Sequence, residues 1–179
     1  GQQLEAAIKK EAARSGLRII GPNCLGIVSS RAKLNASFAG QMPIAGKMAF
    51  LSQSGAICSA ILDLSVQENI GFSYFVSLGS MLDVEFGDMI DYLGGQPEVS
   101  SIVMYVESLT RFRNFMSAAR AVSRVKPIIA LKAGRSAAGA LAAASHTGAL
   151  AGEDAVYDAA LKRAGVLRVK TFEELFDCA

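Results

Sequence analysis

The chain has 179 residues, which is long enough for one domain with a full hydrophobic core. Hydrophobic residues make up 51% and charged residues 19% of the sequence, and this excludes an intrinsically disordered protein. The formal net charge of +2 is too small to argue for nucleic acid or an acidic membrane surface as a partner. No apolar run is long enough to span a bilayer.

The three cysteines, Cys24, Cys58 and Cys178, lie far apart and show no paired spacing. With a single histidine they cannot build a metal site, so we expect no metal. An odd number of cysteines without a secretory segment predicts free thiols in a reducing compartment. We therefore expect a cytoplasmic protein.

Apolar, β-rich runs alternate with helical patterns through most of the chain, which is typical of a parallel sheet covered on both faces. The sequence predicts strands at Lys47–Leu51, Phe72–Ser77, Ile102–Val106, Pro127–Leu131 and Val166–Val169. It predicts helices at Gly55–Glu68, Val84–Leu93, Arg111–Arg124, Glu153–Ala164 and Thr171–Cys178, with Thr171 as an N-cap. This pattern fits an α/β, flavodoxin-like, doubly wound parallel sheet of strand order 2-1-3-4-5.

Residues before about Ile44 do not follow this alternation. They predict a helix at Gln2–Arg14, a strand at Leu17–Ile20 and a turn at residues 21–24. Together these resemble the closing βα piece of a separate, mostly missing domain. We therefore expect a boundary between residues 1–43 and 44–179, in a chain cut from a longer protein.

The first predicted strand of the main sheet ends in Ser52-Gln53-Ser54-Gly55 and leads directly into a helix. The N–H groups and the positive dipole end of such a helix favour an anion. Ser52 and Ser54 add hydroxyl donors, and Gly55 permits close backbone approach. Taken alone, the turn is better explained as an ordinary serine N-cap.

Two further groups are predicted at the same edge of the sheet. Glu107 ends the third strand, where a carboxylate could accept the Nδ1–H of an imidazole and leave Nε2 as a nucleophile. Without a partner, Glu107 is more simply a solvated acid. The only histidine, His146, lies in a loop of small residues after the fourth strand, a poor place for a core residue.

An anion cradle, an orienting acid and an accessible imidazole together favour phosphoryl transfer through a phosphohistidine. A serine hydrolase fits less well, because Ser52 occupies the place of the first glycine in Gly-x-Ser-x-Gly. No Walker-type Gly-Lys-Ser/Thr loop is present.

Four motifs make the chain resemble the succinyl-CoA-synthetase-like flavodoxin domain of the NDP-forming acyl-CoA synthetases. In chain order they are the loop at residues 21–26, the turn at residues 52–55, Glu107 and the loop at residues 145–149. The resemblance covers nearly the whole chain. It implies an acyl- and CoA-proximal loop at Gly21, Pro22, Asn23 and Cys24. It implies a phosphohistidine site formed by Ser52, Gln53, Ser54, Gly55, Ser145, Thr147 and Gly148, with Glu107 orienting the phosphorylated His146.

The resemblance also implies a reaction and partners. Acyl-CoA and phosphate give acyl phosphate and CoA, acyl phosphate phosphorylates His146, and the histidine passes the group to ADP. CoA and Mg-ADP or Mg-ATP are then substrates, with no tightly bound cofactor. Residues 1–43 would be the remnant of a Rossmann-like CoA-binding domain. An ATP-grasp domain would be the other partner, in an oligomer, and the chain alone would be inactive.

Two alternatives remain. Asn35-Ala36-Ser37-Phe38, residues 71–75 and residues 167–169 resemble bacterial protein lysine acetyltransferases, in which a synthetase-like region senses ligand beside an acetyltransferase domain. The second alternative is a flavodoxin-like binding or assembly module in which His146 is incidental. This alternative predicts that His146→Asn changes no activity.

Overall fold

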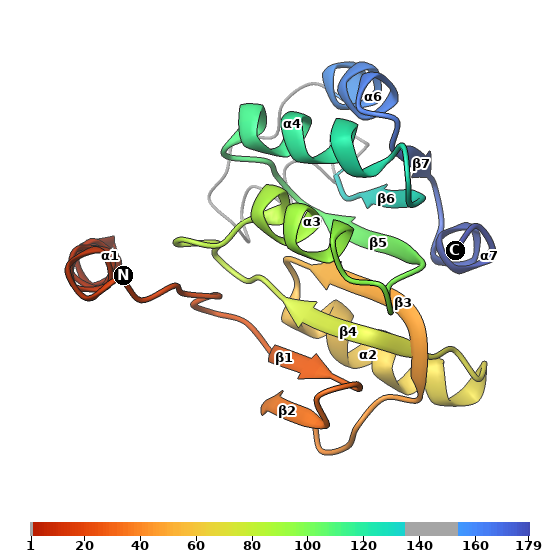
Figure 1. The fold of residues 1–179 in the computed structure, drawn as a ribbon, viewed down its shortest axis with the longest axis horizontal. Helices are drawn as coiled ribbons and strands as arrows, with labels where there is room; N and C mark the ends of the chain where they lie inside the picture. The colour runs from red at the N-terminus through yellow and green to blue at the C-terminus, as the bar shows by residue number, and fades with distance from the viewer. Residues whose placement is uncertain (1, 135–153) are drawn as a thin grey trace.

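The computed structural model describes residues 2–134 and 154–179, which form one mixed α/β sheet structure (Figure 1). Seven strands lie in the order β2-β1-β4-β3-β5-β6-β7. The five strands β3 to β7 are parallel to their neighbours among these five. Numbered 1 to 5 along the chain, they lie in the sheet in the order 2-1-3-4-5. The strands are β1 (Gly26–Ser29), β2 (Leu34–Ser37), β3 (Ala45–Ser52), β4 (Phe72–Ser77), β5 (Ser101–Val106), β6 (Ile128–Lys132) and β7 (Leu167–Val169).

Helices cover both faces of the parallel strands. The described helices are α1 (Gln2–Ser15), α2 (Gly55–Gln67), α3 (Phe86–Gly94), α4 (Phe112–Val122), α6 (Asp154–Arg163) and α7 (Phe172–Asp177). Side chains of α3, α4 and α6 pack with Leu51 and Met104 on one face. Side chains of α2 and α7 pack with Phe50 and Val103 on the other. Neighbouring residues of one strand thus enter opposite cores, as the two-residue period of a strand requires.

Strands β3 to β6 form at the predicted positions because each contains a mostly apolar run that is buried on both faces. The short strand β7 also lies where it is predicted, but only Val169 of its three residues is buried. Helix α4 is equally direct, since Phe115, Ala118, Ala119 and Val122 form one buried stripe. At α7 the predicted N-cap is confirmed: the Thr171 hydroxyl accepts the Glu174 N–H at 3.2 Å.

The prediction for the segment before residue 44 is wrong in two respects. Residues 17–20 form no strand. Instead, β1 and β2 form a hairpin that extends the sheet, because Ile27 of β1 pairs antiparallel with Val76 of β4. The sheet is therefore mixed rather than wholly parallel, and it crosses the expected boundary at residue 44. Four-residue strands with so little apolar alternation give no clear signal in the sequence.

The predicted helix at Val84–Leu93 begins two residues later, at Phe86. Glu85 and Asp88 form a capping box, in which the Asp88 carboxylate accepts the Glu85 N–H at 2.9 Å. Val84 instead donates its N–H to the Ile19 carbonyl at 3.0 Å, and Ile19 donates its own N–H to Asp83 at 2.8 Å. The N-terminal segment is thus attached to the loop before α3, and the helix begins only after this contact.

Candidate functional site

The turn after β3 is held together by its two serines. The Ser52 hydroxyl is fully buried, accepts the Ser54 N–H and donates to the Ser54 carbonyl, both at 3.0 Å. The Ser54 hydroxyl caps α2 by accepting the Ile57 N–H at 3.3 Å. The N–H groups of Gly55 and Ala56, in the first turn, have no carbonyl within the helix to bond. Two free donors and the positive end of the helix dipole are groups to which an anion can bind.

Gln53 lies between the two serines but faces the neighbouring strand. Its side-chain oxygen accepts the N–H of Glu107 at 2.7 Å and the N–H of Ser108 at 2.9 Å. Its Nε2 donates to the Ser108 hydroxyl at 3.3 Å. The end of β3 and the end of β5 are therefore joined through one side chain, and Glu107 is attached to the serine turn.

The loop at residues 21–24 is held by the segment that follows β4. Ser80 donates its N–H to the Pro22 carbonyl and Leu82 donates its N–H to the Gly21 carbonyl, both at 2.9 Å. The Gly21–Pro22 peptide is cis, and Asn23 has a positive φ of 53°. A Cβ on Gly79 would lie 2.2 Å from the Pro22 carbonyl oxygen. Only glycine permits this approach of the two loops.

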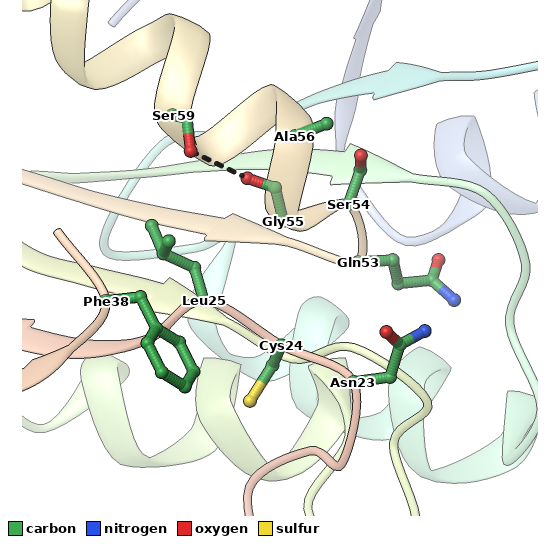
Figure 2. A pocket seen from close by; sticks show the side chains of 9 residues that line it. All are labelled: Asn23, Cys24, Leu25, Phe38, Gln53, Ser54, Gly55, Ala56 and Ser59. Carbon is green, nitrogen blue, oxygen red and sulfur yellow. Dashed lines mark hydrogen bonds between the residues drawn. The ribbon is translucent and has the colours of Figure 1, made fainter.

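The loop and the turn meet at one cavity of about 650 Å³ (Figure 2). Figure 2 shows the amides of Asn23 and Gln53 pointing toward the same side, with Phe38 at the opposite end. The cavity thus has a polar end near the start of α2 and a more apolar end. Its lining residues are Asn23, Cys24, Leu25, Phe38, Gln53, Ser54, Gly55, Ala56 and Ser59. Sequence reasoning assigned the loop and the turn to separate domains, and it gave neither Leu25 nor Phe38 a place in the site.

Neither thiol near the site is an activated nucleophile. Burial raises the pKa of Cys24, and its Sγ lies 3.9 Å from the Ile20 carbonyl. Burial raises the pKa of Cys58 to about 11. A nucleophilic cysteine needs a lowered pKa, so both thiols act here as packed side chains.

A buried lysine stands beside Glu107, and sequence reasoning gave it no role. Lys132 ends β6, is 3% exposed and pairs in the ladder with Val106. Its Nζ donates to the Ala133 carbonyl at 2.5 Å and lies 4.5 Å from the centre of the Tyr157 ring. Burial lowers the pKa of Lys132, whereas the charge of Glu107 raises it. A lysine directly after an apolar strand was the available signal.

The remaining predicted site residues, Ser145, His146, Thr147 and Gly148, lie outside the described residues. Within residues 2–134 and 154–179, no three His, Cys, Asp or Glu side chains are grouped so that they could hold a metal ion. No described helix has both the length and the apolar character needed to cross a membrane.

The mostly parallel sheet, with a cavity at the carboxyl end of β3, is that of a flavodoxin-like domain. Residues 45–179 match the family model of the succinyl-CoA ligase like flavodoxin domain, and the chain belongs to this family.

Two relatives and one solved structure cover almost the whole chain. The chain is 48% identical over 175 residues to the ADP-forming acetate–CoA ligase of Methanocaldococcus jannaschii, covering 98% of this chain and 25% of that protein. It is 44% identical to the alpha subunit of ADP-forming acetate–CoA ligase II of Pyrococcus furiosus, covering 100% and 39%. The dinucleotide-forming acetyl-coenzyme A synthetase 1 of Ca. Korarchaeum cryptofilum, in complex with phosphate and ADP, superposes with a TM-score of 0.94 at 42% identity, covering 98% and 38%. The chain thus spans between 25% and 39% of the length of these proteins.

Proposed function

We propose that this chain is the phosphohistidine-carrying domain of an ADP-forming acyl-CoA synthetase and that His146 carries the phosphoryl group. The observation that supports the proposal is the shared cavity, in which the Gly21–Cys24 loop faces the donors at the start of α2. Glu107 is attached to the same turn through Gln53. The relatives are ligases of this type by name, and they are similar over nearly all of the chain.

The proposed chemistry follows from these groups. Phosphate displaces CoA from the acyl-CoA, and the acyl phosphate then loses its phosphoryl group to Nε2 of neutral His146, releasing the acid. Glu107 accepts the Nδ1–H and so stabilises the positive charge that develops on the ring. The N–H groups of Gly55 and Ala56 bind the transferred phosphoryl oxygens. ADP, held with Mg²⁺ by an ATP-grasp domain, receives the group last.

Residues 1–43 are, in this proposal, the remnant of a Rossmann-like CoA-binding domain, and the β1–β2 hairpin within them joins this remnant to the flavodoxin-like sheet. Most of that domain and the ATP-grasp domain belong to the remainder of the enzyme, which we expect to be an oligomer. The isolated chain would therefore carry the site of His146 without completing the reaction.

The test is phosphorylation of the complete enzyme with Mg-ATP, followed by intact-mass measurement and phosphorus NMR. We expect one acid-labile phosphate, absent from His146→Asn, with the fold of that variant intact. Glu107→Gln should be phosphorylated more slowly, because an amide stabilises imidazolium less than a carboxylate. A phosphate that persists in His146→Asn would refute the assignment. No phosphate in either protein, with ATP binding measured separately, would favour the ligand-sensing region of a lysine acetyltransferase.

A further inference from the structure

We propose that Gln53 is a positioning residue for Glu107, which it holds through the backbone at the end of β5. This inference rests on the proposed function, because it concerns the rate at which the histidine is phosphorylated. It assigns to Gln53 a role different from a direct contact with phosphate.

The ladder between the two strands ends just before Glu107. The last paired residues of β3 and β5 are Ser52 and Tyr105, and Gln53 adds one backbone bond, from its N–H to the Tyr105 carbonyl at 3.3 Å. On the other side, the last bond between β5 and the end of β6 within the described residues runs from the Ala133 N–H to the Val106 carbonyl. Glu107 therefore leaves the sheet where the strand ladders no longer fix its backbone.

Beyond the end of the ladder, the Gln53 side chain holds the backbone of Glu107 and Ser108. Its oxygen accepts two consecutive N–H groups, those of Glu107 and Ser108, at 2.7 and 2.9 Å. Gln53 and Ser108 are each only 8% exposed, so water cannot easily replace these bonds. Two short bonds to one oxygen fix both the rotamer of Gln53 and the direction in which Glu107 leaves β5.

The same bonds limit what Gln53 can offer to an anion. Its oxygen faces the strand end, and one Nε2 hydrogen faces the Ser108 hydroxyl. At most one N–H donor remains for the cavity that Gln53 lines. If Gln53 acted mainly by donating that N–H to phosphate, its replacement would weaken phosphate binding. If Gln53 acts mainly by positioning Glu107, its replacement lowers the turnover rate.

The experiment uses the complete enzyme, with acetyl-CoA, phosphate and Mg-ADP as substrates. Gln53→Met preserves side-chain length but removes both acceptor bonds. We expect kcat to fall about 10- to 100-fold with the KM for phosphate changed less than about threefold, because a displacement near 1 Å can cost this much in rate. A raised KM for phosphate with unchanged kcat would overturn the proposal.

A double-mutant cycle tests whether Gln53 acts through Glu107. We expect Gln53→Met combined with Glu107→Gln to be about as slow as Glu107→Gln alone, because the second change removes the group that Gln53 positions. Losses that multiply would show an independent role and overturn the inference. Ser108→Ala is the matched control: it removes the 3.3 Å bond, leaves both acceptor bonds, and should retain kcat within about twofold.

Gln53→Glu guards against a simple folding defect, since a carboxylate oxygen can still accept both N–H groups. We expect it to keep the Glu107 and Ser108 amides protected from hydrogen exchange, whereas Gln53→Met should lose that protection. A Glu variant that loses the protection as fully as the Met variant would overturn the proposal.

The inference and the proposed function fail differently. If the unchanged enzyme forms no phosphohistidine, both the proposed function and the inference are refuted. If it turns over and Gln53→Met does so at the same rate, only the inference falls.

Discussion

Gly79→Ala should separate the loop at residues 21–24 from the rest of the site. Gly79 has a φ of +55°, and a Cβ there would lie 2.2 Å from the Pro22 carbonyl oxygen and 2.5 Å from that of Asn23. Both obstacles are backbone atoms, so no side-chain rotation relieves the overlap. The loop must move by about 1 Å, as ordinary contact distances between such atoms exceed 3 Å.

The expected cost follows from three contributions. The left-handed conformation costs alanine roughly 1–2 kcal/mol. Moving the loop weakens two backbone hydrogen bonds, Ser80 to Pro22 and Leu82 to Gly21, at about 1 kcal/mol each. Alanine lowers the entropy of the unfolded chain, which offsets roughly 0.4–1 kcal/mol. The net loss is about 2–3.5 kcal/mol, equivalent to a fall in Tm of about 4–14 °C for a domain of this size.

The assay is urea and thermal unfolding of Gly79→Ala beside two comparison variants. Gly40→Ala is the matched control, because its Cβ meets nothing within 4 Å and its φ is not positive, so we expect a change within about 0.5 kcal/mol. Gly79→Asn tests the cause: asparagine tolerates the left-handed region but still overlaps the carbonyls. The steric argument is refuted if Gly79→Ala is as stable as Gly40→Ala, or if Gly79→Asn restores the stability of the unchanged protein.

Two further predictions concern α2. Ser54→Ala removes the bond to the Ile57 N–H and should lower the free energy of unfolding by about 1 kcal/mol, whereas Ser59→Ala, which loses only an exposed bond to the Gly55 carbonyl, should change it by less than about 0.5 kcal/mol in the same urea titration. At pH 8 a thiol reagent should label the exposed Cys178 and leave Cys58 unlabelled until urea unfolds the chain, because burial raises the pKa of Cys58 to about 11 and the thiolate is the reactive form. Equally fast labelling of both thiols in the folded protein would contradict the burial of Cys58.

The parallel strands were predictable because their signal is local. A run such as Ile128–Leu131 is apolar throughout, and burial on both faces explains it. The hairpin of β1 and β2 carries no such signal, since its stability comes from pairing with β4, more than 40 residues away in the sequence. Long-range pairing of a four-residue strand cannot be inferred from its own residues.

The candidate site divides in the same way. The serine turn was predictable from Ser54 and Gly55, because capping and close approach depend on neighbouring residues. The bonds that join Gln53 to Glu107 and Ser108 span sequence separations of 54 and 55 residues, so only the fold shows them. Sequence reasoning assigned Gln53 to the phosphate site, and only the fold shows that its oxygen also accepts the backbone N–H of Glu107. The position of Lys132 after an apolar strand gave only a weak indication of its burial, because an isolated lysine is usually exposed.

The segment that follows β4 joins the two walls of the cavity. Leu78 donates its N–H to the Ser52 carbonyl at 2.7 Å, at the base of the serine turn. The Ser77 hydroxyl accepts the Leu25 N–H at 2.9 Å, and the next residues bond the loop at residues 21–24. The serine turn and the Gly21–Cys24 loop are therefore positioned by one backbone segment that contains no proposed substrate contact. The two walls share this support but meet it at different residues, so Gly79→Ala acts on the loop at residues 21–24, whereas Ser54→Ala acts on the turn alone.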